Sequence, residues 1–190
     1  MLPHGRLLSK TLVHFISDLA GFAVLTTISL LWARWSKLDL GFSASNFRRA
    51  EPWVLIFILW GTAEWAITIF LPVEADPDWI AQQQQFSLGE HLIAAVLLAP
   101  VAEELFFRGA MFAALLRRWG IRTAVIVPSL IWAIMHVQYG WWDVALIAGS
   151  GVLLAMVRWK SGSLYLPVGL HAAWNLLVTL DYHGLFGSLA

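Results

Sequence analysis

The stretch Ala99-Pro-Val-Ala-Glu-Glu-Leu-Phe-Phe-Arg-Gly109 places two adjacent glutamates and an arginine inside a long apolar segment. Ionisable side chains are costly to bury at membrane depth, so they usually mark a functional site. Two later apolar stretches each contribute a histidine, in Trp132-Ala-Ile-Met-His136 and His171-Ala-Ala-Trp-Asn175. Together these residues indicate the active site of an enzyme that works inside the bilayer.

The composition is that of a membrane protein. Of the 190 residues, 59% are hydrophobic and 13% are charged, whereas soluble domains carry about 25% charged residues. Twelve tryptophans agree with this, because indole rings favour the membrane–water interface. The net charge is zero and no basic block is present, so nothing indicates a nucleic-acid partner. Cysteine is absent, which excludes disulfides, thiolate catalysis and cysteine metal sites.

Six segments are candidates for membrane helices, which need about 20 mostly apolar residues. They cover residues 11–32, 52–72, 88–118, 123–138, 144–159 and 163–180. Pro52 and Pro72 are expected at the ends of the second helix, because proline suits helix boundaries. Pro100 interrupts the third segment, which predicts either one long helix kinked at Pro100 or a short re-entrant piece followed by a span. The predicted fold is an all-helical, polytopic membrane bundle of about six helices.

The domain organisation is expected to be simple. Residues 1–190 would form one membrane domain, because no soluble domain, linker or internal repeat is visible. Residues 88–180 would be the catalytic core that holds the three motifs. Residues 1–87 would add two accessory spans and the polar loop 73–87. The small residues of Gly149-Ser-Gly151 are expected to permit close helix packing.

The segments between the predicted helices differ in charge. Basic residues follow the first, third and fifth segments: Arg34, Lys37, Arg48, Arg49, Arg117, Arg118, Arg122, Arg158 and Lys160. The alternate connections carry acidic residues: Glu74, Asp76, Asp78, Asp143 and Asp181. Under the positive-inside rule the basic connections are cytoplasmic, which puts both termini outside. Arg6 and Lys10 argue against that orientation of the N-terminus.

The first motif separates two glutamates by their neighbours. Glu104 and Arg108 are four residues apart, so they share a helix face and are expected to form an ion pair. Glu103 points about 100° away from Glu104 on a helix. It has no obvious local partner, which makes it the better candidate for general-base chemistry. The alternative is that all three residues form one stabilising salt-bridge network.

The histidines carry the second and third motifs. His136 ends its apolar segment, with Trp132 one turn before it on the same face; a packing role for this histidine is the alternative. His171 and Asn175 are one turn apart on one helix face, which suits donors aimed at a developing oxyanion. The alternative for this pair is an interhelical polar clamp. Glu64, midway along the second segment, is expected to face the bundle interior.

The order and spacing of Glu103-Glu-x-x-x-Arg108, aromatic-x-x-x-His136 and His171-x-x-x-Asn175 resemble the CPBP family of intramembrane proteases. This family is also called the CAAX protease and bacteriocin-processing, or Abi, family, and it includes the type II CAAX prenyl endopeptidases. The resemblance runs from about residue 88 to residue 180. The family usually has phenylalanine where this chain has Trp132. Because the exchange keeps an aromatic ring, we expect it to affect pocket shape more than chemistry.

The resemblance implies peptide-bond hydrolysis within or at the edge of the membrane. Glu103 and His136 would hold and activate the attacking water. His171 and Asn175 would stabilise the tetrahedral oxyanion. The residues that brace the site or contact the substrate would be Glu104, Arg108 and Trp132.

Zinc-dependent hydrolysis is the alternative to water activated by a glutamate alone. Glu103, His136 and His171 would supply a two-histidine, one-carboxylate set with an open position for water. No His-Glu-x-x-His motif supplies paired ligands and a base on one helix. We therefore favour a water activated by glutamate, without a metal or other cofactor.

Two interpretations without hydrolysis remain open. Buried Glu, His and Arg in a helix bundle also fit a proton-coupled transporter, although no inverted repeat supports one. The other is a non-catalytic scaffold or immunity factor that keeps the motifs. If the protein is a protease, its expected partner is a membrane-embedded or lipidated substrate in a prokaryotic cytoplasmic membrane. Candidates are a prenylated C-terminus, a bacteriocin or pheromone precursor, and the sorting tail of an exported protein.

Overall fold

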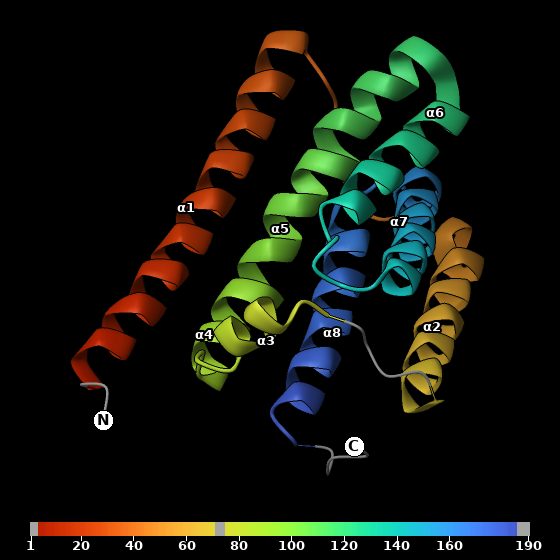
Figure 1. Cartoon of the computed structure of the whole chain (residues 1–190). Coiled ribbons are helices and arrows are strands. Elements are labelled where there is room, and N and C mark those ends of the chain that lie inside the picture. Colours follow the sequence, from red (N-terminus) through yellow and green to blue (C-terminus); the bar gives the residue numbers. More distant parts are fainter. Residues whose placement is uncertain (1–3, 71–74, 186–190) are drawn as a thin grey trace.

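The computed structural model describes residues 4–70 and 75–185, and within these ranges it contains helices and no strand (Figure 1). The all-helical class is therefore confirmed. The helices are α1 (His4–Ser36), α2 (Phe47–Phe70), α3 (Pro77–Gln83), α4 (Leu88–His91), η1 (Leu92–Leu98), α5 (Ala99–Glu104), η2 (Leu105–Met111), α6 (Phe112–Ile134), α7 (Trp141–Ser161) and α8 (Tyr165–Tyr182). Each of the six predicted segments overlaps one or more of these helices, although 123–138 extends past the end of α6 and 163–180 begins before α8.

Two helices of the described part are long and apolar enough to cross a membrane. They cover Thr11–Ser36 in α1 and Trp141–Ser161 in α7. A buried core helix of a soluble protein meets the same criteria, so these two helices alone do not establish six spans.

One continuous helix carries the first motif. It comprises α4, η1, α5, η2 and the first part of α6, and it runs from residue 88 to residue 119 (Figure 1). A capping box starts it: the Ser87 N–H donates to the Glu90 carboxylate (2.8 Å), and the Glu90 N–H donates to Ser87 Oγ (3.3 Å). Gly120 (φ 78°) ends it, because that backbone conformation suits only glycine. α6 then continues as a second leg over residues 121–134.

Pro100 does not divide this helix. The seven residues of η1, just before α5, are π-helical, and so are the seven residues of η2 after it. Such π turns occur inside α-helices, often at functional sites. The structure therefore shows the single long helix and not the re-entrant alternative.

One expected boundary of the second helix was wrong. α2 begins at Phe47, and Pro52 lies inside it. The Asn46 side chain caps this earlier start by accepting from the Arg49 N–H (3.3 Å). The predicted end at Pro72 lies outside the described residues.

The polar segment 73–87 contains a helix that we did not predict. Asp76 caps α3, because its carboxylate accepts from the N–H groups of Asp78 (2.8 Å) and Trp79 (3.2 Å). The Asp76 N–H donates to the Gln138 carbonyl (2.8 Å), so α3 is joined to the connection between α6 and α7.

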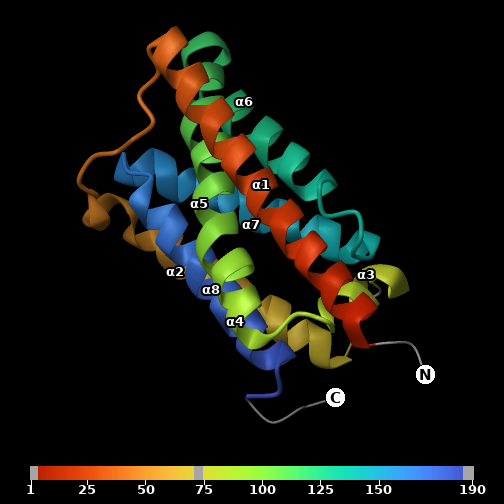
Figure 2. The ribbon, with the colours of Figure 1, turned by 90° about the vertical axis from the view of Figure 1, so that its left-hand side faces the viewer.

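Close packing around α7 brings the remaining helices together. A Cβ on Gly149 would overlap the Trp60 ring of α2, and a Cβ on Gly151 would lie 3.0 Å from Cβ of Ser129 in α6. The expectation that Gly149-Ser-Gly151 permits close packing is confirmed. α1 lies along the long helix, and α8 packs against η1 and α5 (Figures 1 and 2).

The connections gather at two opposite ends of the bundle (Figure 2). At one end, backbone hydrogen bonds join the α1–α2 connection to the α7–α8 connection, from Asn46 to Ser161 (2.9 Å) and from Leu164 to Gly41 (2.8 Å). Arg117, near the bend in α6, reaches the Ser36 carbonyl at the same end (2.9 Å). The other end holds the start of α1, α3, the α6–α7 connection and the end of α8.

Candidate active site

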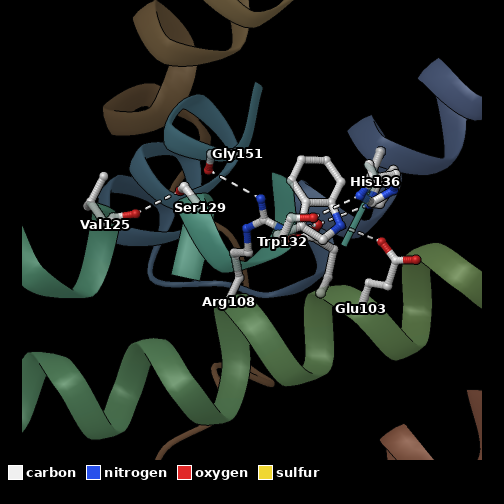
Figure 3. A network of polar contacts seen from close by, with 9 residues as sticks. Glu103, Arg108, Val125, Ser129, Trp132, His136 and Gly151 are labelled. Atoms are coloured by element: carbon white, nitrogen blue, oxygen red, sulfur yellow. Dashed lines mark hydrogen bonds and ion pairs between the residues drawn. The ribbon is translucent and has the colours of Figure 1, made fainter. Parts of the chain in front are cut away.

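The three predicted motifs meet in one place. Glu103 and Glu104 come from α5 and Arg108 from η2, midway along the long helix. Trp132 belongs to the last turn of α6, and His136 lies in the turn that follows (Figure 3). The residues contributed by α8 are His171 and Asn175.

The buried side of the site is built around Glu104. Its Oε1 accepts from Arg108 Nη1 (2.7 Å), and both side chains are fully buried (0% exposed). The predicted ion pair is confirmed. The same oxygen lies 3.0 Å from His171 Nδ1, and Arg108 Nη2 also donates to the Gly151 carbonyl in α7 (3.2 Å). Removing either charge would leave the other buried and unpaired, which is expensive.

The half-buried side of the site contains the other carboxylate. Trp132 Nε1 donates to Glu103 Oε2 at 2.5 Å (Figure 3). The Trp132 ring also lies edge-on to the rings of His136 (5.2 Å between centroids) and His171 (5.3 Å). The Arg108 guanidinium stacks over it, 4.5 Å from the centroid. Trp132 therefore contacts both sides of the site.

The exchange of phenylalanine for tryptophan adds a hydrogen bond to the site, and its effect on the chemistry stays a prediction. Phenylalanine has no N–H, so it could not donate to Glu103 as Trp132 does. The sequence did indicate that Trp132 would make a hydrogen bond, because an indole N–H in an apolar segment usually finds a partner. Nothing local identified that partner, which is 29 residues away.

The hydrogen-bond partners fix the tautomers of both histidines. His136 Nδ1 lies 2.8 Å from the Trp132 carbonyl, which only accepts, so the proton sits on Nδ1. Nε2 of a neutral His136 is then a free acceptor. His171 Nδ1 faces the Glu104 carboxylate and must likewise donate. With Nδ1 donating, His171 Nε2 is a donor only in the imidazolium form.

Asn175 makes an interhelical contact, the alternative that we kept open for it. Its Nδ2 donates to the Ala95 carbonyl in η1 (2.8 Å). In the π register an N–H reaches the carbonyl five residues back, as the Ala99 N–H does with Ala94. The next donor to Ala95 would be Pro100, which has no N–H. Asn175 satisfies this carbonyl with one of the two N–H groups of its amide.

The turn after α6 adds a residue that we did not predict. The Tyr139 ring stacks on His136 (6.2 Å, 16° between planes) and meets Trp79 of α3 edge-on (4.8 Å). Burial raises the pKa of the Tyr139 phenol to about 12, and the charges of Asp143 and Glu103 act in the same direction. The phenol is therefore neutral at physiological pH. Its position three residues after a candidate catalytic histidine was the available signal.

Glu64 lies apart from the three motifs. It is half-buried and accepts from Ser150 Oγ of α7 at 3.3 Å. The expectation that it faces the bundle interior is confirmed.

The zinc set is not assembled. Among the described residues, no three His, Asp or Glu side chains lie close enough together to hold a metal ion. This includes the conditional set of Glu103, His136 and His171.

Comparison with known proteins supports the resemblance found in the motifs. The family model of type II CAAX prenyl endopeptidase Rce1-like proteins matches residues 86–177, which include every motif residue. The resemblance to the CPBP family of proteases is thereby confirmed. No curated protein and no solved structure is detectably similar to the chain.

Proposed function

Starting from the match of residues 86–177 to the type II CAAX prenyl endopeptidases, we propose that this protein is an intramembrane endopeptidase. It hydrolyses a peptide bond in a membrane-anchored or lipidated protein. The observation that carries the proposal is the arrangement around Trp132, which contacts the Glu103 carboxylate and the His136 ring. Both side chains are half-buried, whereas Glu104 and Arg108 behind them are fully buried. A water molecule can therefore reach a base held against a rigid, charged support.

The residues divide the chemistry between them. Glu103 accepts a proton from the water as its oxygen attacks the carbonyl carbon, while His136 Nε2 accepts the second O–H and orients it. His171 as imidazolium, with the second N–H of Asn175, donates to the oxyanion. Glu103 then returns its proton to the leaving amine as the C–N bond breaks. Glu104 orients His171 through its Nδ1, and Arg108 pairs with Glu104.

Six crossings of the bilayer accompany this function. Large apolar side chains on the outer faces support them, such as Leu12 (55% exposed), Leu59 (68%) and Ile134 (63%). Exposed apolar surface of this extent marks a membrane or protein contact. We place the protein in a prokaryotic cytoplasmic membrane.

The reaction we propose uses no metal. The spacing of the acidic and histidine side chains supports this. So does the hydrogen bond from Trp132 to Glu103, which occupies one carboxylate oxygen.

Cleavage by the purified protein tests the proposal. Wild type, Glu103→Gln and His171→Ala are compared in detergent on a library of lipidated C-terminal peptides, with and without a zinc chelator. Glu51→Gln, at an exposed glutamate of α2, is the matched control. Loss of the general base should lower turnover by about 10²–10⁴-fold, while Glu51→Gln and the chelator leave it unchanged.

Three results would change the interpretation. Equal cleavage by Glu103→Gln and wild type would refute the assigned base. Inhibition by the chelator would favour zinc. Proton flux in liposomes without cleavage would favour the transporter.

A further inference from the structure

The basic residues of the chain lie mostly at one end of the bundle. Of its 12 lysines and arginines, those at this end are Arg34, Lys37, Arg48, Arg49, Arg117, Arg118, Arg122, Arg158 and Lys160. The hydrogen bonds among residues 36–46, 117 and 161–164 hold these connections together. Two acids, Asp39 and Glu51, lie there as well, but the positive-inside rule counts lysine and arginine, not net charge.

The opposite end is poor in basic residues. Arg6 and Lys10, in the first turns of α1, are its only lysine or arginine, and Arg108 lies inside the bundle. The acids described at this end are Asp76, Asp78, Glu90, Asp143 and Asp181. The basic end has nine lysines and arginines and the opposite end has two. Under the positive-inside rule the basic end therefore faces the cytoplasm.

The active site is closed toward the basic end. Behind Glu103 lie the fully buried Glu104 and Arg108. A further layer of buried residues separates them from the bend at Gly120: Phe112 (2% exposed), Ala124 (0%), Val125 (5%) and Ala155 (0%). Figure 3 shows the same order along α6, from Val125 through Ser129 and Trp132 to His136. Buried side chains therefore separate Glu103 from the basic end.

Polar groups border the site toward the acidic end. His136 begins the α6–α7 connection, which continues with Gln138, Tyr139 and Gly140. The Gln138 carbonyl accepts from the Asp76 N–H at 2.8 Å, which places the start of α3 beside the same turn. Both Glu103 and His136 are partly exposed. The turn and α3 therefore lie beside the partly exposed side of the site.

We infer that the active site opens on the face of the membrane away from the cytoplasm. This rests on the proposed function, and it narrows the substrate to a protein whose scissile bond has already been exported. The reaction before cleavage is then translocation of the substrate across the membrane. A bond that remains in the cytoplasm, as in a protein prenylated there, has no access to Glu103.

The absence of cysteine makes the test direct. Single cysteines are introduced as Gln84→Cys beside α3, Gln138→Cys in the turn after α6 and Ser45→Cys at the basic end. Gln84 and Ser45 are exposed. The hydrogen bond from Asp76 to Gln138 uses the backbone carbonyl of Gln138, which a cysteine at this position keeps. Spheroplasts that produce each variant are treated with a membrane-impermeant maleimide before and after permeabilisation, and the cysteine-free parent gives the background.

We expect labelling of Gln84→Cys and Gln138→Cys in sealed spheroplasts at the level reached after permeabilisation. Ser45→Cys should stay at background until the membrane is opened. Labelling of Ser45→Cys in sealed spheroplasts would overturn the inference. So would labelling of Gln138→Cys only after permeabilisation, or not at all.

This test is independent of catalysis. The same three cysteines in a Glu103→Gln background should give the same pattern, because labelling needs no turnover. If the pattern holds and no peptide is cleaved, the orientation stands and the proposed function alone fails. If cleavage is found and the labelling pattern is reversed, the proposal of a protease is kept and the inference of an exported substrate is rejected.

Discussion

At the residue scale, Trp132 joins the two sides of the site. Its indole N–H donates to Glu103, its ring stacks under Arg108, and its edges meet both histidines. A phenylalanine would keep the ring contacts and lose only the hydrogen bond. Substitution at this position therefore measures the effect of one hydrogen-bond donor on Glu103, the proposed base.

We expect Trp132→Phe to lower turnover by at least tenfold. A hydrogen bond to a charged group is worth about 1.5–3 kcal/mol, and without it Glu103 is free to rotate away from the water. The measurement is kcat on a cleaved peptide. The matched control is Trp119→Phe, at a tryptophan that is 63% exposed. Equal kcat in the two variants would show that the Trp132 hydrogen bond does not position the base.

Removing one of the two buried charges should lower the stability of the protein strongly. Arg108→Ala leaves Glu104 buried beside His171 without its cation and frees the Gly151 carbonyl. The free energy of unfolding should fall by about 3–5 kcal/mol, as measured by denaturant titration in detergent. Arg118→Ala, at an exposed arginine of the same helix, should change it by less than about 0.5 kcal/mol. Similar losses in both variants would contradict a special role for the pair.

Because the pKa of Tyr139 is raised in the folded protein, we expect the protein to lose stability at high pH. Its pKa is about 12 in the folded protein, against about 10 for an unperturbed tyrosine. Below about pH 10 the phenol is neutral in both states, so it has no effect there. Between about pH 10 and 12 the unfolded chain loses the proton first, so stability falls, by up to about 3 kcal/mol. Tyr139→Phe should lack this part of the fall in unfolding midpoint, whereas Tyr165→Phe, at an exposed tyrosine, should retain it.

Local spacing predicted some contacts of the site and missed others. The pairing of Glu104 with Arg108 follows from helix geometry alone. The contact of His171 with Glu104 joins residues 67 positions apart, and no local rule predicts which glutamate a distant histidine approaches. The motif resemblance placed these residues in one site, but it did not assign the individual hydrogen bonds.

At the scale of the helix, the π-helical segment before Pro100 explains the position of Asn175. Sequence spacing indicated an irregularity at this proline but could not decide its form, because a kink, a break and a π turn all accommodate the missing N–H. The start of α2 was missed for a related reason. The cap at Asn46 and the packing of the helix outweigh the tendency of Pro52 to sit at a boundary.

A double-mutant cycle tests the link between Asn175 and Pro100. Asn175→Ala leaves the Ala95 carbonyl without its donor and should lower the free energy of unfolding by about 1–3 kcal/mol. In a Pro100→Ala background the restored N–H supplies a donor, so the same substitution should cost less. Coupling energies for residues that share a partner are about 0.5–3 kcal/mol. Additive effects in denaturant titrations would show that the two residues do not share this carbonyl.

The crossing of α6 and α7 depends on Gly151. A methyl group there would meet Cβ of Ser129 at 3.0 Å and its backbone at 3.2 Å, and it would shift the carbonyl that binds Arg108. Gly151→Ala should cost about 1–3 kcal/mol of stability and reduce cleavage. Gly169→Ala in α8, where nothing lies within 4 Å of the new Cβ, should be neutral or slightly stabilising. Equal stability of the two variants would contradict the close packing.

At the scale of the whole molecule, composition predicted the class of fold, and charge predicted which connections share an end. The hydrogen bonds between the α1–α2 and α7–α8 connections agree with the grouping of their basic residues. The helix α3 was not predicted, because a polar seven-residue helix has no apolar face whose period would reveal it. Its contact with the α6–α7 turn depends on the tertiary fold.

The division of the active site among three segments has a consequence for how the protein is made. Glu104 and Arg108 are synthesised first, Trp132 and His136 next, and His171 and Asn175 only with α8. Until α8 is inserted, Glu104 lacks its histidine and the Ala95 carbonyl lacks its amide. In the proposed mechanism, an unfinished chain would therefore hold the base Glu103 without its oxyanion donors. If the proposed function is correct, hydrolysis would begin only after α8 has joined the other helices.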